Sequence, residues 1–352
     1  MKKILLLIII CLFACSIYSY PYSMESTSSV GMGNAKTAVA DDENAIFQNP
    51  AGLADINNLS LVLFGDLLMY SWAGDSYLNS SGEYFNIASS ISLVNKNYGF
   101  NIFYRSEGEQ NNNLDYIDVD KLGVTIKEVV ITGAYGLRIT DYFSLGMNVK
   151  YDFFVDEMVD GKNTVLFGIA ALFKFMENFK IGINIHDLGG FNFNGYCIFD
   201  NYGRVLSSGI LPWDIDIGIS YRLNETLLIA FDMNNIIGEE INMPQVVPAD
   251  AEYFDPAMAN LTRYNIGLRC HLVDSLVIYS GVVFAEDIQD FYSIAGKTHS
   301  YKKVFKTIAS VGFDWKYENF IIGLAVNNDF RQVENIYLPF GYFIEIEYVF
   351  GR

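Results

Sequence analysis

The 352-residue sequence has few of the residues from which disulfides and metal sites are built. Only 4 residues are cysteines. Two of these, Cys11 and Cys15, lie in the first apolar stretch, which leaves Cys197 and Cys270 in the rest of the chain. Two cysteines so far apart make neither a disulfide framework nor a metal-binding motif. Cysteine chemistry therefore gives no indication of function.

Histidine is scarcer still, with 3 residues: His186, His271 and His299. None is at helical spacing to another or in a compact cluster with acids, so no orienting partner for catalysis can be identified. The chain also lacks a Gly-rich phosphate loop, a Gly-x-Ser-x-Gly nucleophile elbow and a Cys-x-x-Cys pair. We predict no catalytic residues, no metal ligands and no cofactor, and we expect that the protein is not an enzyme.

Long hydrophobic runs are missing beyond the N-terminus, although 51% of the residues are apolar. Residues 1–19 have the pattern of a secretory signal peptide, with Lys2 and Lys3 ahead of an apolar run from Ile4 to Phe13. That run is too short to cross a bilayer as a helix, which takes about 20 residues. We predict cleavage after this leader, the alternative being a permanent N-terminal anchor.

Basic residues are outnumbered by acids, 23 to 41. Removal of the leader takes away Lys2 and Lys3 and no acid, so the net charge changes from −18 to −20. A chain this acidic repels phosphate backbones, and we therefore predict no nucleic-acid partner. The acids are concentrated in segments that we predict to be long loops, around residues 107–127, 188–212, 236–261 and 286–305.

What the sequence does have is regular alternation of apolar and polar residues from position 59 to the end. The clearest run is Tyr142 to Val155, in which Phe143, Leu145 and Met147 alternate with Ser144, Gly146 and Asn148. With that run, fourteen such segments can be counted; the others lie near 59–70, 84–94, 97–106, 128–139, 162–175, 178–187, 213–222, 226–235, 262–272, 275–285, 306–317, 319–329 and 341–350. An even number of strands is what a closed bacterial membrane barrel requires.

The two faces of these predicted strands differ in chemistry. One face is apolar, for example at Ile215, Ile217 and Ile219, while the other carries charges of both signs. Charges facing lipid are costly, so we expect these charges to point into the lumen or to lie near the membrane interfaces. The predicted fold is an all-β, transmembrane antiparallel barrel of about 14 strands, residues 59–352. A soluble β-sandwich is the alternative, and the 24 tyrosines and 27 phenylalanines favour the barrel.

The segment ahead of the first strand is the most informative one in the chain. It runs from Gly31 to Gly52, is rich in small residues, contains the step Asp41-Asp42 and ends in the turn Asn49-Pro50-Ala51. Asn49 is predicted to cap a short helical turn that begins at Pro50, where a missing N–H does no harm. Gly31 and Gly33 allow a close approach to another backbone.

This segment closely resembles the N-terminal hatch of the FadL family of outer-membrane hydrophobic-compound transporters, and of its relative PorV. The match is specific over about residues 30 to 54. The resemblance implies that residues 20–58 form a hatch, or plug, inside the barrel. It also implies gating roles for Gly31, Gly33, Asn49, Pro50 and Ala51. The alternative is a capped helical turn that has no gating role.

The resemblance further implies a monomer in the bacterial outer membrane, surrounded by outer-membrane lipids, that transports hydrophobic small molecules inward. Long-chain fatty acids are the default substrate, and the ligand-binding residues are unknown at this stage. The alternative function is that of PorV: a partner of a secretion system or of a surface protein, without solute transport. A barrel that only binds ligands or proteins at the surface belongs to the same class.

Overall fold

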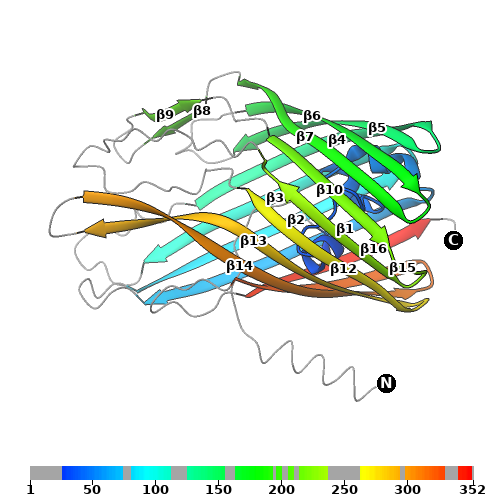
Figure 1. Ribbon diagram of the computed structural model, residues 1–352. Coiled ribbons are helices and arrows are strands. Elements are labelled where there is room, and N and C mark those ends of the chain that lie inside the picture. Colours follow the sequence, from blue (N-terminus) through cyan, green and yellow to red (C-terminus); the bar gives the residue numbers. More distant parts are fainter. Residues whose placement is uncertain are drawn as a thin grey trace, which may run out of the picture.

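The computed structural model describes residues 26–73, 81–111, 125–154, 163–192, 196–199, 205–209, 214–236, 262–293, 298–329 and 340–350. Over these residues the chain forms a closed antiparallel barrel of fourteen strands (Figure 1). The strands are β1 (Leu59–Ala73), β2 (Ser81–Asn95), β3 (Tyr98–Asn111), β4 (Thr125–Thr140), β5 (Phe143–Phe154), β6 (Asn163–Met176), β7 (Phe179–Asn192), β10 (Asp214–Arg222), β11 (Leu227–Asn234), β12 (Arg263–Val273), β13 (Leu276–Ser293), β14 (Thr298–Tyr317), β15 (Phe320–Asp329) and β16 (Phe340–Phe350). The predicted signal peptide, residues 1–19, lies outside the described residues.

Almost every strand pairs with its neighbour in the sequence. The exception is β7, which pairs with β10 because β8 (Tyr196–Phe199) and β9 (Val205–Gly209) form a separate two-stranded sheet. The barrel closes where β1 pairs with β16, with Leu59 opposite Phe350. The beginning and the end of the barrel therefore lie at the same end of the cylinder. The prediction of fourteen closed antiparallel strands is confirmed.

The two faces of the wall are as predicted. On β10, Ile217 and Ile219 are 40% and 42% exposed on the outside, while Asp216 before them and Ser220 after them are buried on the inside. The last strand behaves in the same way, with Ile344 and Ile346 outside and Glu345 inside. An apolar exterior with a polar interior is the arrangement that a barrel in lipid requires.

The turns at one end are short, for example Asp141–Tyr142 between β4 and β5. At the other end, the prediction of a long loop at 286–305 is wrong. Most of it belongs to β13 and β14, which continue as a paired hairpin as far as Ser293 opposite Thr298. This hairpin projects beyond the neighbouring strands (Figure 1). The prediction relied on the acids Glu286, Asp287 and Asp290, and these lie within β13.

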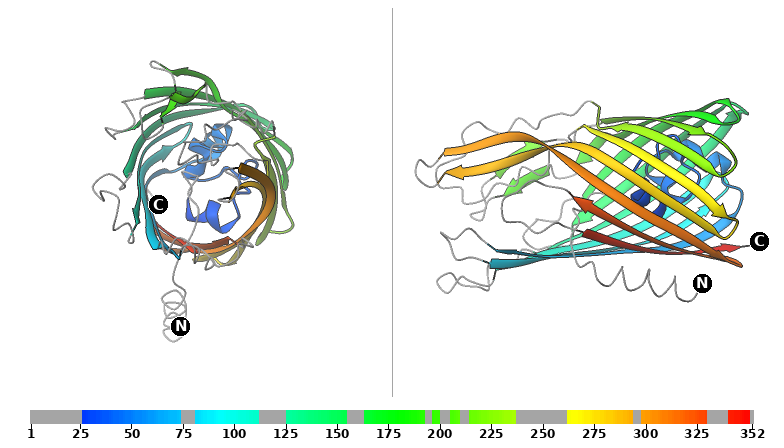
Figure 2. Two further views of the ribbon diagram at one scale, coloured as in Figure 1. Left: turned by 90° about the vertical axis from the view of Figure 1, so that its left-hand side faces the viewer. Right: turned by 60° about the horizontal axis from the view of Figure 1, so that its bottom comes forward.

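Residues 26–58 lie inside the barrel, as the view along its axis shows (Figure 2). We call them the inner segment. It contains the helix α2 (Thr27–Gly31) and two 3₁₀ helices, η1 (Glu43–Ile46) and η2 (Pro50–Asp55). In the part of the chain that the structure describes, no helix has the length and apolarity to cross a membrane.

Candidate functional site: the inner segment and the wall around it

The inner segment begins with a helix whose first residues bond to the wall. Ser26 caps α2 by accepting a hydrogen bond from the backbone N–H of Ser29 at 3.2 Å. The backbone N–H of Thr27 donates to Glu345 Oε2 on β16 at 2.9 Å. Val30, on the same helix, packs against Phe64 and other apolar residues of the wall. The start of the segment is therefore fixed to the region where the barrel closes.

Gly31 and Gly33 lie against the wall. A Cβ on Gly31 would come within 2.7 Å of the Cβ of Tyr279, closer than real side chains approach. Gly33 has a φ of +59°, which favours glycine, and a Cβ there would be 2.9 Å from the backbone nitrogen of Val282. The structure thus places both glycines where their small size matters.

The wall also has glycines where it faces the inner segment. On each of nine strands, one glycine faces the inner segment at a position where a Cβ would crowd the segment. We call this set the glycine ring: Gly99, Gly136, Gly146, Gly182, Gly218, Gly267, Gly281, Gly312 and Gly323. Several lie directly opposite one another on paired strands, such as Gly182 and Gly218. A Cβ on Gly182 would collide with the carbonyl oxygen of Thr37, and one on Gly267 would lie 2.6 Å from that of Met32. At most of these glycines, therefore, the backbone of the wall lies against the backbone of the segment, while Gly99 and Gly323 meet side chains of the segment.

The glycine ring was missed by the sequence analysis, although a signal was present. Glycine within a strand weakens it and often marks the close approach of another backbone. Four of the strands carry glycine between two aliphatic residues, in Ile181-Gly182-Ile183, Ile217-Gly218-Ile219, Ile266-Gly267-Leu268 and Ile322-Gly323-Leu324. The recurrence of this pattern from strand to strand indicates a common contact on one face.

A buried cation holds the middle of the segment together. Lys36 is fully buried, and its Nζ lies 2.5 Å from Asp42 Oδ2 and 3.9 Å from Asp41 Oδ1. Burial alone would lower the pKa of Lys36, but the charges of Asp42 and Asp41 outweigh it and raise this pKa above its usual value. Lys36 therefore stays charged and pairs with the acidic step that the sequence analysis singled out.

Asp41 in turn links the segment to the wall. Its carboxylate accepts two hydrogen bonds from Arg269 on β12, at 2.9 and 2.8 Å. Burial would raise the pKa of Asp41, but Arg269 and Lys36 lower it well below its usual range. A bidentate pair of this kind is both strong and directional. We call it the first clasp.

The Asn49-Pro50-Ala51 turn has the local geometry that the sequence indicates. Asn49 caps η2, since its Oδ1 accepts from the backbone N–H of Ala51 at 3.1 Å, and Pro50 is the first residue of the helix. The other side of the Asn49 amide donates to Thr37 O at 2.7 Å and to Ala171 O of β6 at 3.2 Å. This fully buried side chain therefore joins η2, the preceding part of the segment and the wall.

The end of the segment is held by a second clasp. Asp55 Oδ1 accepts from Lys174 Nζ at 2.5 Å and from Arg138 Nη2 at 2.7 Å. Burial would raise the pKa of Asp55, but these two hydrogen bonds hold it below its usual value. Arg138 and Lys174 lie two residues before the ends of β4 and β6. The second clasp is therefore at the short-turn end of the barrel.

Charged side chains of strands β5, β7 and β10 also pair with one another. His186 Nδ1 lies 2.8 Å from Asp187 and its Nε2 lies 3.5 Å from Asp216, while Lys150 bonds to Asp187 at 3.2 Å. The statement that no histidine lies in a compact cluster with acids is therefore wrong for His186, because pairing of β7 with β10 brings Asp216 to it. Among the described residues, no group of three or more His, Cys, Asp or Glu side chains could hold a metal ion.

No protein-family model and no curated protein matches this sequence. Solved structures do match, among them a Pseudomonas aeruginosa FadL homologue with a TM-score of 0.59 at 11% identity, covering 95% of this chain and 100% of that one. The fold is that of a FadL-type barrel. The resemblance seen in the sequence is confirmed at the level of the fold.

Two further FadL-type barrels are similar to this chain. The Ralstonia pickettii toluene transporter TbuX matches with a TM-score of 0.59 at 13% identity, covering 93% of this chain and 98% of that one. A deltaS2S3 mutant of the monoaromatic hydrocarbon channel TodX matches with a TM-score of 0.63 at 14% identity, covering 92% of this chain and 98% of that one. All three similarities extend over nearly the whole length of both chains.

Proposed function

We propose that this protein is a transporter of the bacterial outer membrane, a monomer that carries hydrophobic small molecules inward through a plugged barrel. The observation that carries the proposal is the inner segment, which is bound to the wall of a FadL-type barrel by two clasps and the glycine ring. A segment held by a limited set of polar contacts can be displaced locally while the closed strand pairing keeps the barrel intact.

The proposed role of the inner segment is that of a hatch. Gly31 and Gly33 let it lie close to the wall, and Asn49 with Pro50 and Ala51 fixes its course before the first strand. Local movement of residues 31–53 would open a route for ligand. No energy source within the chain is needed for this, since a hydrophobic ligand moves down its own gradient.

The substrate class that we propose is hydrophobic. Apolar side chains on the inner face, such as Phe103, Leu166 and Leu172, support this, because an apolar ligand needs apolar contacts. Leu172 also packs against Ala51 of the inner segment, so movement of the hatch would expose it. TbuX and TodX are named for toluene and monoaromatic hydrocarbons, which adds small aromatics to long-chain fatty acids as candidate substrates.

We also infer that the protein is not an enzyme. The solved structures reported above are those of transporters and channels, which supports this inference. The alternative function, a PorV-like partner of a secretion system or surface protein, differs from transport in what it predicts for ligand binding and for cross-linking.

The proposal can be tested by two measurements on purified protein. Mass spectrometry of co-purifying molecules should recover hydrophobic compounds, and planar bilayers should show low ion conductance because the segment occupies the lumen. Large open-pore conductance without a bound hydrophobe would indicate a porin. Neither conductance nor a bound hydrophobe, together with a protein partner recovered by cross-linking in cells, would favour the secretion-partner function.

A further inference from the structure

The inner segment is not packed equally tightly on all sides. Nine strands approach it through the glycine ring, but β1 does not: its glycine, Gly65, is on the outer face opposite Ile344, and its inner face carries Val62 and Phe64. Neighbouring β2 presents Ser90 and Ser92 to the inside in place of glycine. The sector formed by β1 and β2 therefore differs from most of the wall.

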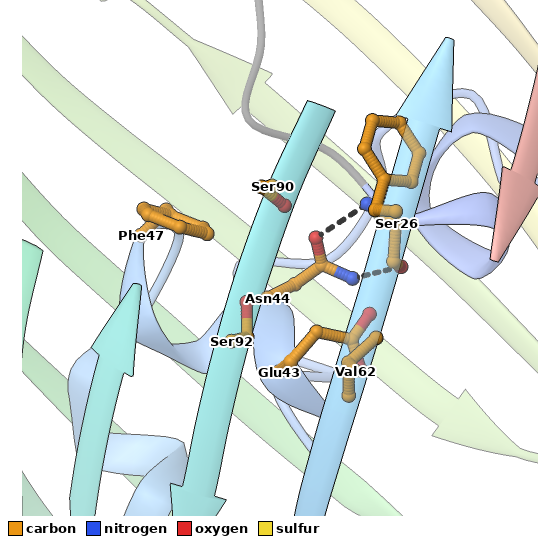
Figure 3. Close-up of a pocket in the computed structure, with 8 residues that line it drawn as sticks. Ser26, Glu43, Asn44, Phe47, Val62, Ser90 and Ser92 are labelled. Atoms are coloured by element: carbon orange, nitrogen blue, oxygen red, sulfur yellow. Dashed lines mark hydrogen bonds between the residues drawn. The ribbon is translucent and has the colours of Figure 1, made fainter. Parts of the chain in front are cut away.

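A small cavity lies between the segment and this sector (Figure 3). On the wall it is lined by Val62 and Phe64 from β1 and by Ser90 and Ser92 from β2. It has room for about one water molecule. The segment and the wall are thus separated here by a gap, whereas at the glycine ring their backbones are in contact.

On the segment side, the cavity is lined by residues at the start of η1 and just after it. Glu43 faces the cavity with an Oε1 atom that is buried and has no hydrogen-bond partner. Glu43 itself is only 7% exposed. A buried polar atom without a partner is unfavourable, so this part of the segment is held less well than the rest.

The contacts that flank this stretch fix both of its ends. Asp41 is held by the first clasp, and Asn49 by its bonds to Thr37 and Ala171. Residues 42–48 between them bond to the wall through two amide side chains, which donate to the carbonyls of Ile46 at 2.9 Å and Phe47 at 3.5 Å. The stretch also bonds to the start of the segment, where Asn44 Oδ1 accepts from Ser26 N–H at 3.0 Å and Gln48 Nε2 donates to Ser29 Oγ at 2.9 Å. A stretch with few bonds to the wall between two anchored ends can move without release of the whole segment.

We call the gap between η1 and the inner faces of β1 and β2 the seam. Towards the short-turn end it is closed by apolar contacts, beside one hydrogen bond from the backbone N–H of Asn97, in the β2–β3 turn, to Leu53 O at 3.0 Å. There Val94 of β2 packs with Ile46 and Leu53 of the segment. Contacts between apolar side chains can be replaced by contacts with an apolar ligand at little cost, because neither arrangement exposes more apolar surface to water. Polar ligands and ions would gain nothing from opening this contact.

We propose that a hydrophobic small molecule passes the inner segment along the seam between η1 and the inner faces of β1 and β2. The inference rests on the proposed transport function and adds the route. Ligand enters at the Ser90–Ser92 cavity, η1 tilts away from β2, and the ligand separates Val94 from Ile46. The clasps stay in place throughout, and so do the contacts of the glycine ring other than that of Gly99 with Ile46.

The test is to fill the seam from the wall. Ser90→Phe and Ser92→Phe place a ring in the cavity, and Ser89→Phe is the matched control, because Ser89 is the exposed neighbour on the outer face of the same strand. Uptake of radiolabelled toluene or oleic acid by proteoliposomes should fall to the level of empty vesicles for the two inward variants. It should remain at the wild-type rate for Ser89→Phe.

Variants that fail to fold are avoided by chemical modification. Ser90→Cys in a Cys197→Ser and Cys270→Ser background adds one thiol to the seam and is close to wild type in size. A bulky maleimide on this thiol should abolish uptake, and a methyl thiosulfonate should reduce it less. Wild-type uptake with Ser90 or Ser92 blocked would overturn the route. If the wild-type protein itself took up neither probe, the proposed function would fail and not the route alone.

Discussion

Asn49 offers the sharpest perturbation of the inner segment. Its side chain is fully buried and makes three hydrogen bonds: it accepts from Ala51 N–H and donates to Thr37 O and Ala171 O. Asn49→Ala removes all three and leaves the carbonyl of Thr37 without this donor. Barrel strands are not affected directly, so the barrel should still insert and close.

The size of the effect follows from these bonds. Loss of an N-cap costs about 1 kcal/mol. Each of the other two hydrogen bonds contributes about 1 kcal/mol net. The free energy that holds η2 in its docked position should therefore fall by about 3 kcal/mol, which is on the order of a 100-fold increase in the undocked population.

Hydrogen exchange followed by mass spectrometry measures this population directly. Peptides covering residues 37–55 should lose protection on the order of 100-fold in Asn49→Ala, while peptides from the barrel strands stay unchanged. Asn58→Ala is the matched control, since Asn58 is exposed at the end of the same segment. Equal exchange in the two variants would refute the reasoning, as would failure of Asn49→Ala to insert into membranes.

Three further predictions concern the same segment and use the same exchange measurement. Gly182→Val should prevent docking, because its side chain meets the segment backbone, whereas Gly133→Ala, with open space around it, should have no effect. Asp55→Asn should free the end of the segment at pH 7. In the wild type, Lys174 lowers the pKa of Asp55, so the contribution of Asp55 to docking of the segment should be complete above pH 3.8 and should be lost as the pH falls below that value. Burial and nearby carboxylates raise the pKa of Glu43 well above 4.5, so docking of the wild-type segment should weaken as the pH rises. Glu43→Gln should therefore increase protection from hydrogen exchange at pH 8 but not at pH 4.

Strands could be predicted from the sequence where only one face is polar. The run Tyr142–Val155 became β5, Phe143–Phe154, because an apolar outer face and a polar inner face impose strict alternation. Prediction failed in β13 and β14 beyond residue 285. There polar residues occupy successive positions of the sequence, such as Glu286 and Asp287, and alternation no longer distinguishes a strand from a loop.

For the candidate site, local geometry could be predicted but partners could not. The cap at Asn49 depends on neighbouring residues and followed from the sequence, as did the close approach at Gly31 and Gly33. The first clasp joins Asp41 to Arg269, which are 228 positions apart in the sequence. In a lumen with many charges of both signs, only the register of the strands decides which residues meet. The glycine ring depends on that register too, since its members become a ring only when the strands are aligned.

The rate at which proteoliposomes take up a hydrophobic probe is the most direct test of the central claim. Vesicles that contain the wild-type protein should take up radiolabelled toluene or oleic acid faster than empty vesicles. Uptake should saturate with probe concentration and should not be accompanied by a comparable leak of small ions. Uptake equal to that of empty vesicles for both probes, from protein whose barrel is shown to be folded, would contradict the account.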